Sequence, residues 1–132
     1  MTYFADGTPY TYLAGTPELG AVNVGWLDVS EPFATGDVAP DLVTLLRRRC
    51  QTMVVNPMRG FHRCNLCAAA AGSTISDAVK VSSGGGDFFV GNAEIRVRGA
   101  DGTVYAAPNM IIHYVEAHGY RPPDVFHDAL AR

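Results

Sequence analysis

The chain has 132 residues, of which 48% are apolar and 17% are charged, and its formal net charge is −3. This length predicts a single domain over residues 1–132 with a buried hydrophobic core. The negative charge offers no general attraction to nucleic acid or to an anionic membrane surface. No segment approaches the roughly 18 consecutive apolar residues of a membrane span, and the first residues lack the basic and apolar regions of a secretion signal. We therefore expect a cytoplasmic protein without a nucleic-acid or membrane partner.

The first 40 residues predict mostly irregular structure. Aromatic side chains are mixed with Gly, Pro and Thr in residues 1–20, which favours an arm packed over the core. Val22, Val24 and Trp26 alternate with polar or small residues, which predicts a short strand. Residues 28–40 are rich in turn-forming residues.

A helix is predicted from Pro40 to about Met53, because its apolar residues recur at spacings of three and four. Asp41 lies in the first turn and Arg47–Arg49 lie near the end, and both placements favour the helix dipole. We interpret the arginine run as a solvated helix end in preference to a phosphate-binding patch. Cys50 lies on the apolar face and is interpreted as a core residue.

A polar segment and a hairpin are expected in the second half of the chain. Residues 72–87 are small, polar and glycine-rich, which predicts a mobile loop. They lack the GxxxxGK[ST] pattern of a phosphate-binding loop. A strand over 88–98, a tight turn over 99–102 and a returning strand over 103–106 predict an antiparallel hairpin.

Two helices are expected after the hairpin. The first is predicted from Pro108, a favoured first helical residue, to His118, with Gly119 as its C-cap. The second is predicted over 122–130. Together with the 40–53 helix, these elements indicate an α+β fold. We expect a small, mostly antiparallel sheet with a central hairpin, one helix before it and two C-terminal helices.

Two cysteines and two histidines form the most informative pattern in the sequence. Cys64 and Cys67 have C-x2-C spacing, and His113 and His118 downstream have H-x4-H spacing. Both spacings lie within the ranges found for zinc ligands. On a helical wheel the two histidines border the buried face about 140° apart. We therefore expect a Zn2+ ion that stabilises the fold and is held by Cys64, Cys67, His113 and His118.

The sequence leaves other ligand sets and other chemistries open. His62, Cys64, Cys67 and His113 could form the site instead, which would leave His118 for another role. A redox cysteine pair without metal is less favoured, because no strand–helix pattern typical of thioredoxin surrounds it. The H-x-E and P-C-x2-C motifs of zinc deaminases are absent in that order, as are HExxH and GxSxG.

A small zinc-dependent enzyme is the second functional hypothesis. Four protein ligands leave no open position for water or substrate, which favours a non-enzymatic domain that binds another protein as an accessory or immunity factor. With only three protein ligands a hydrolase-like role becomes possible, with Glu94 or Asp28 as the base. Asp28 and Glu31 are otherwise interpreted as surface or capping carboxylates.

Four segments carry a resemblance to a known family. They are V-N-V-G-W-L-D at 22–28, R-G-F-H-R-C-N-L-C at 59–67, G-N-A-E-I-R-V at 91–97 and Y-A-A-P-N-M-I-I-H-Y-V-E-A-H-G-Y-R-P-P-D-V-F at 105–126. Together they resemble a family of small uncharacterised bacterial proteins common in actinobacteria, from which residues 72–86 depart as a longer loop. The family has no assigned activity to carry over. The resemblance implies a recurring pattern that includes Gly60, His62, Cys64, Cys67, Glu94, His113 and His118.

Overall fold

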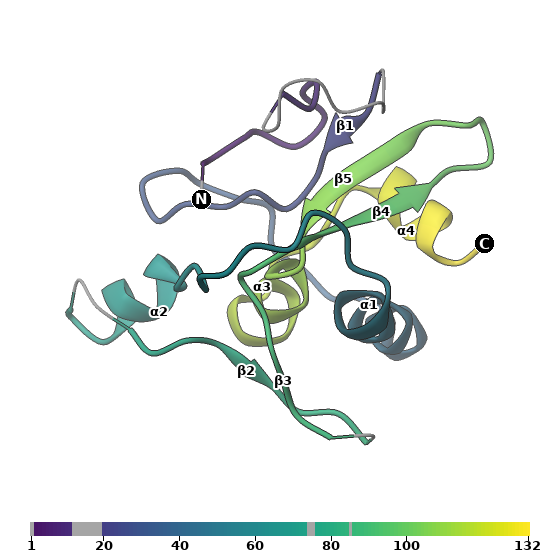
Figure 1. Cartoon of the computed structure of the whole chain (residues 1–132). Helices are drawn as coiled ribbons and strands as arrows, with labels where there is room; N and C mark the ends of the chain where they lie inside the picture. The colour runs from purple at the N-terminus through teal and green to yellow at the C-terminus, as the bar shows by residue number, and fades with distance from the viewer. Residues whose placement is uncertain (1, 12–19, 74–75, 85) are drawn as a thin grey trace.

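The computed structural model describes residues 2–11, 20–73, 76–84 and 86–132, and it confirms the predicted α+β class. Figure 1 shows how the elements are arranged. In chain order they are β1 (Val22–Asn23), α1 (Pro40–Thr52), α2 (Asn65–Ala70), β2 (Lys80–Val81), β3 (Phe88–Phe89), β4 (Glu94–Arg98), β5 (Val104–Pro108), α3 (Ile111–His118) and α4 (Asp124–Leu130).

The predicted hairpin lies at the centre of the fold, although the predicted strand over 88–98 is divided: β3 pairs with β2, and only β4 belongs to the hairpin. β4 and β5 are antiparallel, and their register pairs Glu94 with Pro108 and Arg98 with Val104. β1 adds to the other edge of β5 in parallel orientation, so the strand order is β1-β5-β4. The sequence did not predict this parallel pairing, because a two-residue strand carries no signal for a partner far along the chain.

The two faces of the hairpin pack against different parts of the chain. Ile95 and Val97 belong to the core on the side of the helices, where α1 and α4 contact β4. Glu94 and Arg96 point to the opposite face, because side chains alternate along a strand. There the Tyr10 hydroxyl donates a hydrogen bond of 2.7 Å to Glu94, and the Arg96 guanidinium lies 4.7 Å from the centre of the Tyr10 ring. The N-terminal segment therefore covers this second face, as the predicted arm does (Figure 1).

A second, two-stranded sheet revises the prediction for residues 72–87. β2 and β3 pair in antiparallel orientation, and Val79 and Val81 are buried. The Ser76 hydroxyl donates a hydrogen bond of 3.0 Å to the backbone oxygen of Cys64. The loop prediction is therefore wrong for the part around β2. The two valines alternate with a lysine in a strand pattern that the small polar neighbours obscure.

The helices follow the predicted ranges with two differences. Pro108 ends β5, and α3 begins only at Ile111. Proline is tolerated both in strand positions and in the first turn of a helix, so its presence alone does not separate the two. α2 was not predicted as a helix, although its alanine run favours one. No helix of the described segments is long and apolar enough to cross a membrane. Residues 12–19 of the predicted arm lie outside the described part.

Gly91 allows the segment before Cys64 to lie directly against the hairpin. Its φ is +103°, and a Cβ at this position would be 2.2 Å from the backbone oxygen of His62. The Gly91 N–H donates to the side-chain oxygen of Asn109 at 2.8 Å, and the His62 N–H donates to the Gly91 oxygen at 2.7 Å. The backbone of His62, two residues before Cys64, is therefore hydrogen-bonded to Gly91 before β4, which is in turn hydrogen-bonded to Asn109 after β5.

We expect Gly91→Ala to destabilise the protein much more than Gly102→Ala. Gly102 also has a positive φ, +88°, but no atom lies within 4 Å of a Cβ there. Gly102→Ala therefore isolates the left-handed backbone strain of about 1–2 kcal/mol. At Gly91 the collision with His62 adds to this strain, and the free energy of unfolding should fall by more than about 3 kcal/mol. Urea unfolding of both variants measures the difference, and equal losses would contradict the close approach.

Candidate metal centre

Both histidines of the candidate centre are carried by α3. The helix follows directly from β5 and ends at Gly119, whose φ of 68° is left-handed, while the Tyr120 N–H donates to the Tyr114 oxygen. His113 and His118 are five residues apart, which on a helix is about 140° of rotation and about 7.5 Å of rise. Their rings nevertheless approach to 5.0 Å between centroids and stand nearly perpendicular, at 82°.

Both cysteines lie at the start of the short helix α2. Cys64 is its N-cap residue and is fully buried, and Cys67 lies one turn further on, so both sulfurs are on the same side. The backbone amides of Cys67 and Leu66 partly offset the rise in the pKa of Cys64 that its burial causes. The C-x2-C pair therefore occupies the first turn of a helix.

α2 is held in place by Asn65, one of the two residues between the cysteines. The Asn65 side-chain amide donates to an Asp28 carboxylate oxygen at 2.6 Å and accepts from the Val29 N–H at 3.2 Å. Hydrogen bonds from Ser30, and then from Asn65, lower the pKa of Asp28. Asp28 thus positions the cysteine helix, a role closer to the predicted capping carboxylate than to a base. The sequence signal for this contact is an asparagine within the C-x2-C motif.

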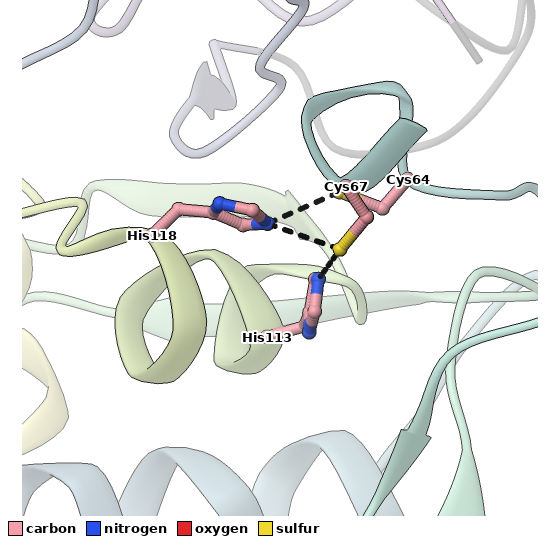
Figure 2. Close-up of side chains that lie close together, drawn as sticks. All are labelled: Cys64, Cys67, His113 and His118. Carbon is pink, nitrogen blue, oxygen red and sulfur yellow. Dashed lines mark hydrogen bonds between the residues drawn. The ribbon is translucent and has the colours of Figure 1, made fainter. Parts of the chain in front are cut away.

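The structure brings Cys64, Cys67, His113 and His118 together. The Cys67 sulfur lies 3.2 Å from Nε2 of His113 and 3.3 Å from Nε2 of His118, and the Cys64 sulfur lies 3.5 Å from Nε2 of His118. Figure 2 shows both imidazole rings reaching from α3 toward the sulfurs of α2. All four candidate ligand atoms lie within 4.8 Å of one another.

These distances suit a tetrahedral metal ion. Bond lengths of about 2.3 Å to sulfur and about 2.0–2.1 Å to nitrogen place neighbouring S and N atoms about 3.5 Å apart in a tetrahedral zinc site. The three short sulfur–nitrogen distances fall at or slightly below this value. The four side chains can therefore hold a metal ion without a change in the path of the backbone.

Burial favours the neutral forms of three of these side chains, Cys64, His113 and His118. Burial, with Cys67 nearby, raises the pKa of Cys64 to about 11. Burial and the neighbouring His118 lower the pKa of His113 to about 4, and burial lowers the pKa of His118. Neutral imidazoles are ready to bind a metal, and a bound cation would favour the thiolate form of the cysteines.

The other candidate residues lie apart from this group. His62, the alternative ligand, does not belong to the four-residue cluster, and burial lowers its pKa. Glu94, a candidate base, is buried and accepts hydrogen bonds from Tyr10 and Arg96. Cys50 lies in the hydrophobic core, as predicted, and burial raises the pKa of its thiol to about 12. Neither Glu94 nor Cys50 therefore belongs to the cluster.

Comparison with known proteins identifies a family for the chain but no function. No curated protein and no solved structure matches the chain. A family model described as a domain of unknown function, DUF7919, matches residues 2–131. This agrees with the expected likeness to an uncharacterised family, whereas its bacterial distribution and recurring motifs stay predictions. Because the match spans nearly the whole sequence, the chain belongs to the DUF7919 family.

Proposed function

We propose that this protein is a zinc-stabilised, non-enzymatic domain that binds another protein. The observation that carries the zinc assignment is the convergence of four ligand atoms from α2 and α3, which lie 46 to 54 positions apart along the chain. Two thiolates and two imidazoles are a donor set that favours zinc among the common biological metals. In this proposal Cys64, Cys67, His113 and His118 are the ligands.

The proposed ion has a structural role because it would join α2, a short helix held by the hydrogen bonds of Asn65, to α3. The helix has six residues, of which Ala68 is the buried one in its body. Isolated helices of this length are not stable in water. A metal that joins α2 to α3 would therefore contribute directly to the free energy of folding. All three cysteines are free, and thiolate ligands persist in a reducing compartment, which supports a cytoplasmic location.

We expect the purified protein to contain one zinc ion per molecule, bound by two sulfur and two nitrogen atoms. Cys67→Ser and His118→Ala should each lose most of the metal and lower the melting temperature, because each removes one ligand. His62→Ala is the matched control and should retain the metal. Elemental analysis, X-ray absorption and thermal unfolding with and without chelator measure these effects. A metal-free protein that is equally stable in chelator would refute the zinc centre, and metal loss in His62→Ala would move it.

The enzymatic alternative requires one of the four ligands to leave the metal. Four protein ligands fill the tetrahedron, so no bound water is available to be acidified. Two thiolates also donate charge to the ion, which makes it a weaker Lewis acid. Glu94, the base considered for this alternative, has its carboxylate engaged by Tyr10 and Arg96. These features favour the structural role over hydrolysis.

We predict no zinc-dependent turnover of ester, phosphoester, amide or nucleoside substrates. The measurement is a substrate screen with the zinc-loaded protein and with its chelator-treated form as the blank. Glu94→Gln and His118→Ala serve as controls for any activity that is found. Turnover that is lost in either variant while the metal is retained would establish the enzymatic alternative.

A group of exposed apolar side chains supports the protein-binding part of the proposal. Phe61 and Phe89 are 41% and 49% exposed, their ring centroids are 5.7 Å apart, and Met58 is 50% exposed. Aromatic and methionine side chains of this kind are frequent in protein interfaces. The exposed Arg59 and Arg63 flank Phe61. The partner that fits this surface presents apolar side chains together with acidic ones.

A photo-crosslinking residue in place of Phe89 should capture one partner protein in cells. The same residue in place of Val125, which is 55% exposed on α4, is the control position. The captured protein, once purified, should bind at least about tenfold more weakly to Phe61→Ser, because an aromatic anchor is lost. Equal labelling from both positions, or unchanged affinity for Phe61→Ser with zinc retained, would refute the assigned surface.

A further inference from the structure

A cavity lined by four arginines lies at the edge of β4 that faces away from β5. Its volume is about 420 Å³, within the usual range of small-molecule sites. The elements that form it are α1, β4, β5 and the end of α4, and α1, β4 and α4 contact one another (Figure 1). Its lining consists of Arg49, Arg96, Arg98 and Arg132 with Val104 and Ala129.

The cavity concentrates positive charge in a chain whose net charge is −3. Among the described residues, no Asp or Glu lines it, and Glu94 is the carboxylate that forms an ion pair with one of its arginines, Arg96, at 2.9 Å. Glu94 balances the charge of Arg96, and the guanidinium groups of Arg49, Arg98 and Arg132 leave a local excess of three positive charges. Guanidinium groups gathered in this way repel one another, and a bound anion would relieve the repulsion.

Part of the arginine cluster also protects the edge of β4. Val55 pairs with Glu94 at the start of the strand. Further along, Arg49 donates through Nη1 to the backbone oxygen of Arg96, and Arg132 donates through Nη1 to that of Arg98. Capping an edge explains two of the arginines. A guanidinium carries five N–H donors, so a contact through one nitrogen leaves others that can face a ligand.

We propose that this cavity binds the diphosphate group of a small metabolite. Planar guanidinium groups bind phosphate oxygens in pairs and with high specificity. One phosphate monoester carries about −1.5 to −2 charges, so two phosphate groups match an excess of three positive charges better than one does. None of the described residues that line the cavity is aromatic and could stack on a base, so recognition rests on the charged group of the ligand.

The ends of two helices oppose this binding only weakly. Arg49 lies in the last turn of α1, and Arg132 follows α4. A helix C-terminus carries a partial charge of about −0.5. The excess of three full positive charges outweighs two such ends. The chain's negative net charge still opposes binding of an extended nucleic acid, which a compact cavity also fits poorly.

Calorimetric titration of the zinc-loaded protein with inorganic pyrophosphate at low salt tests the proposal. One saturable site is expected, with affinity at least about tenfold higher than for orthophosphate or citrate. Arg49→Gln and Arg98→Gln should each weaken pyrophosphate binding about tenfold, since each removes a charge-assisted contact. Arg48→Gln is the matched control, because Arg48 is exposed beside Arg49 and does not line the cavity.

Melting temperature and zinc content are measured as controls for the pyrophosphate titration. Arg49→Gln also removes the contact with the Arg96 oxygen, so the rise in melting temperature caused by pyrophosphate is compared within each variant. Zinc is measured after each titration, because pyrophosphate itself binds metals. Three outcomes would overturn the proposal. They are pyrophosphate binding that is accounted for by the zinc released, an affinity for pyrophosphate that is unchanged in Arg49→Gln and Arg98→Gln, and an affinity for citrate equal to that for pyrophosphate. A failure of the zinc centre alone would leave the arginine cavity in place.

Discussion

The antiparallel pairing of β4 with β5 determines where the other elements of this protein can lie. β1 attaches to the outer edge of β5, and the Trp26 indole donates to the Ala106 oxygen of that strand. The helices cover one face of the hairpin, while the N-terminal segment covers the other through Tyr10. Each of these contacts joins parts of the chain that are distant in sequence and therefore carries a larger loop-closure cost than the local pairing of β4 with β5.

The two ends of the hairpin carry different chemistry. At the open end, β5 leads into the histidine helix, and Gly91 before β4 holds the backbone of His62 ahead of the cysteines. At the edge toward the closed end, arginines of β4 meet those of α1 and of the C-terminal residues. A partly buried group of thiol and imidazole side chains thus occurs in the same small molecule as a strongly cationic cavity.

Much of the fold was predictable because its signals are local. The period of apolar residues identified α1, the turn residues identified the hairpin, and Gly119 identified the end of α3. β2 and the parallel pairing of β1 were missed, because strands of two residues contain too few positions for a period to emerge. The sequence predicts Pro108 in the helix, whereas it is the last residue of β5. The fixed φ of proline suits both positions, so the residue type does not distinguish them.

The sequence by itself determined the donor chemistry of the candidate centre and the side of each element on which the donors lie. The tertiary structure alone decided that His118 faces the cysteines while His62 does not belong to their cluster. It also decided that Arg49, Arg98 and Arg132 share one cavity. The physical reason is that residue type and spacing fix how a side chain projects from its own helix or strand. Which other element that side chain meets depends on packing between segments that are far apart along the chain.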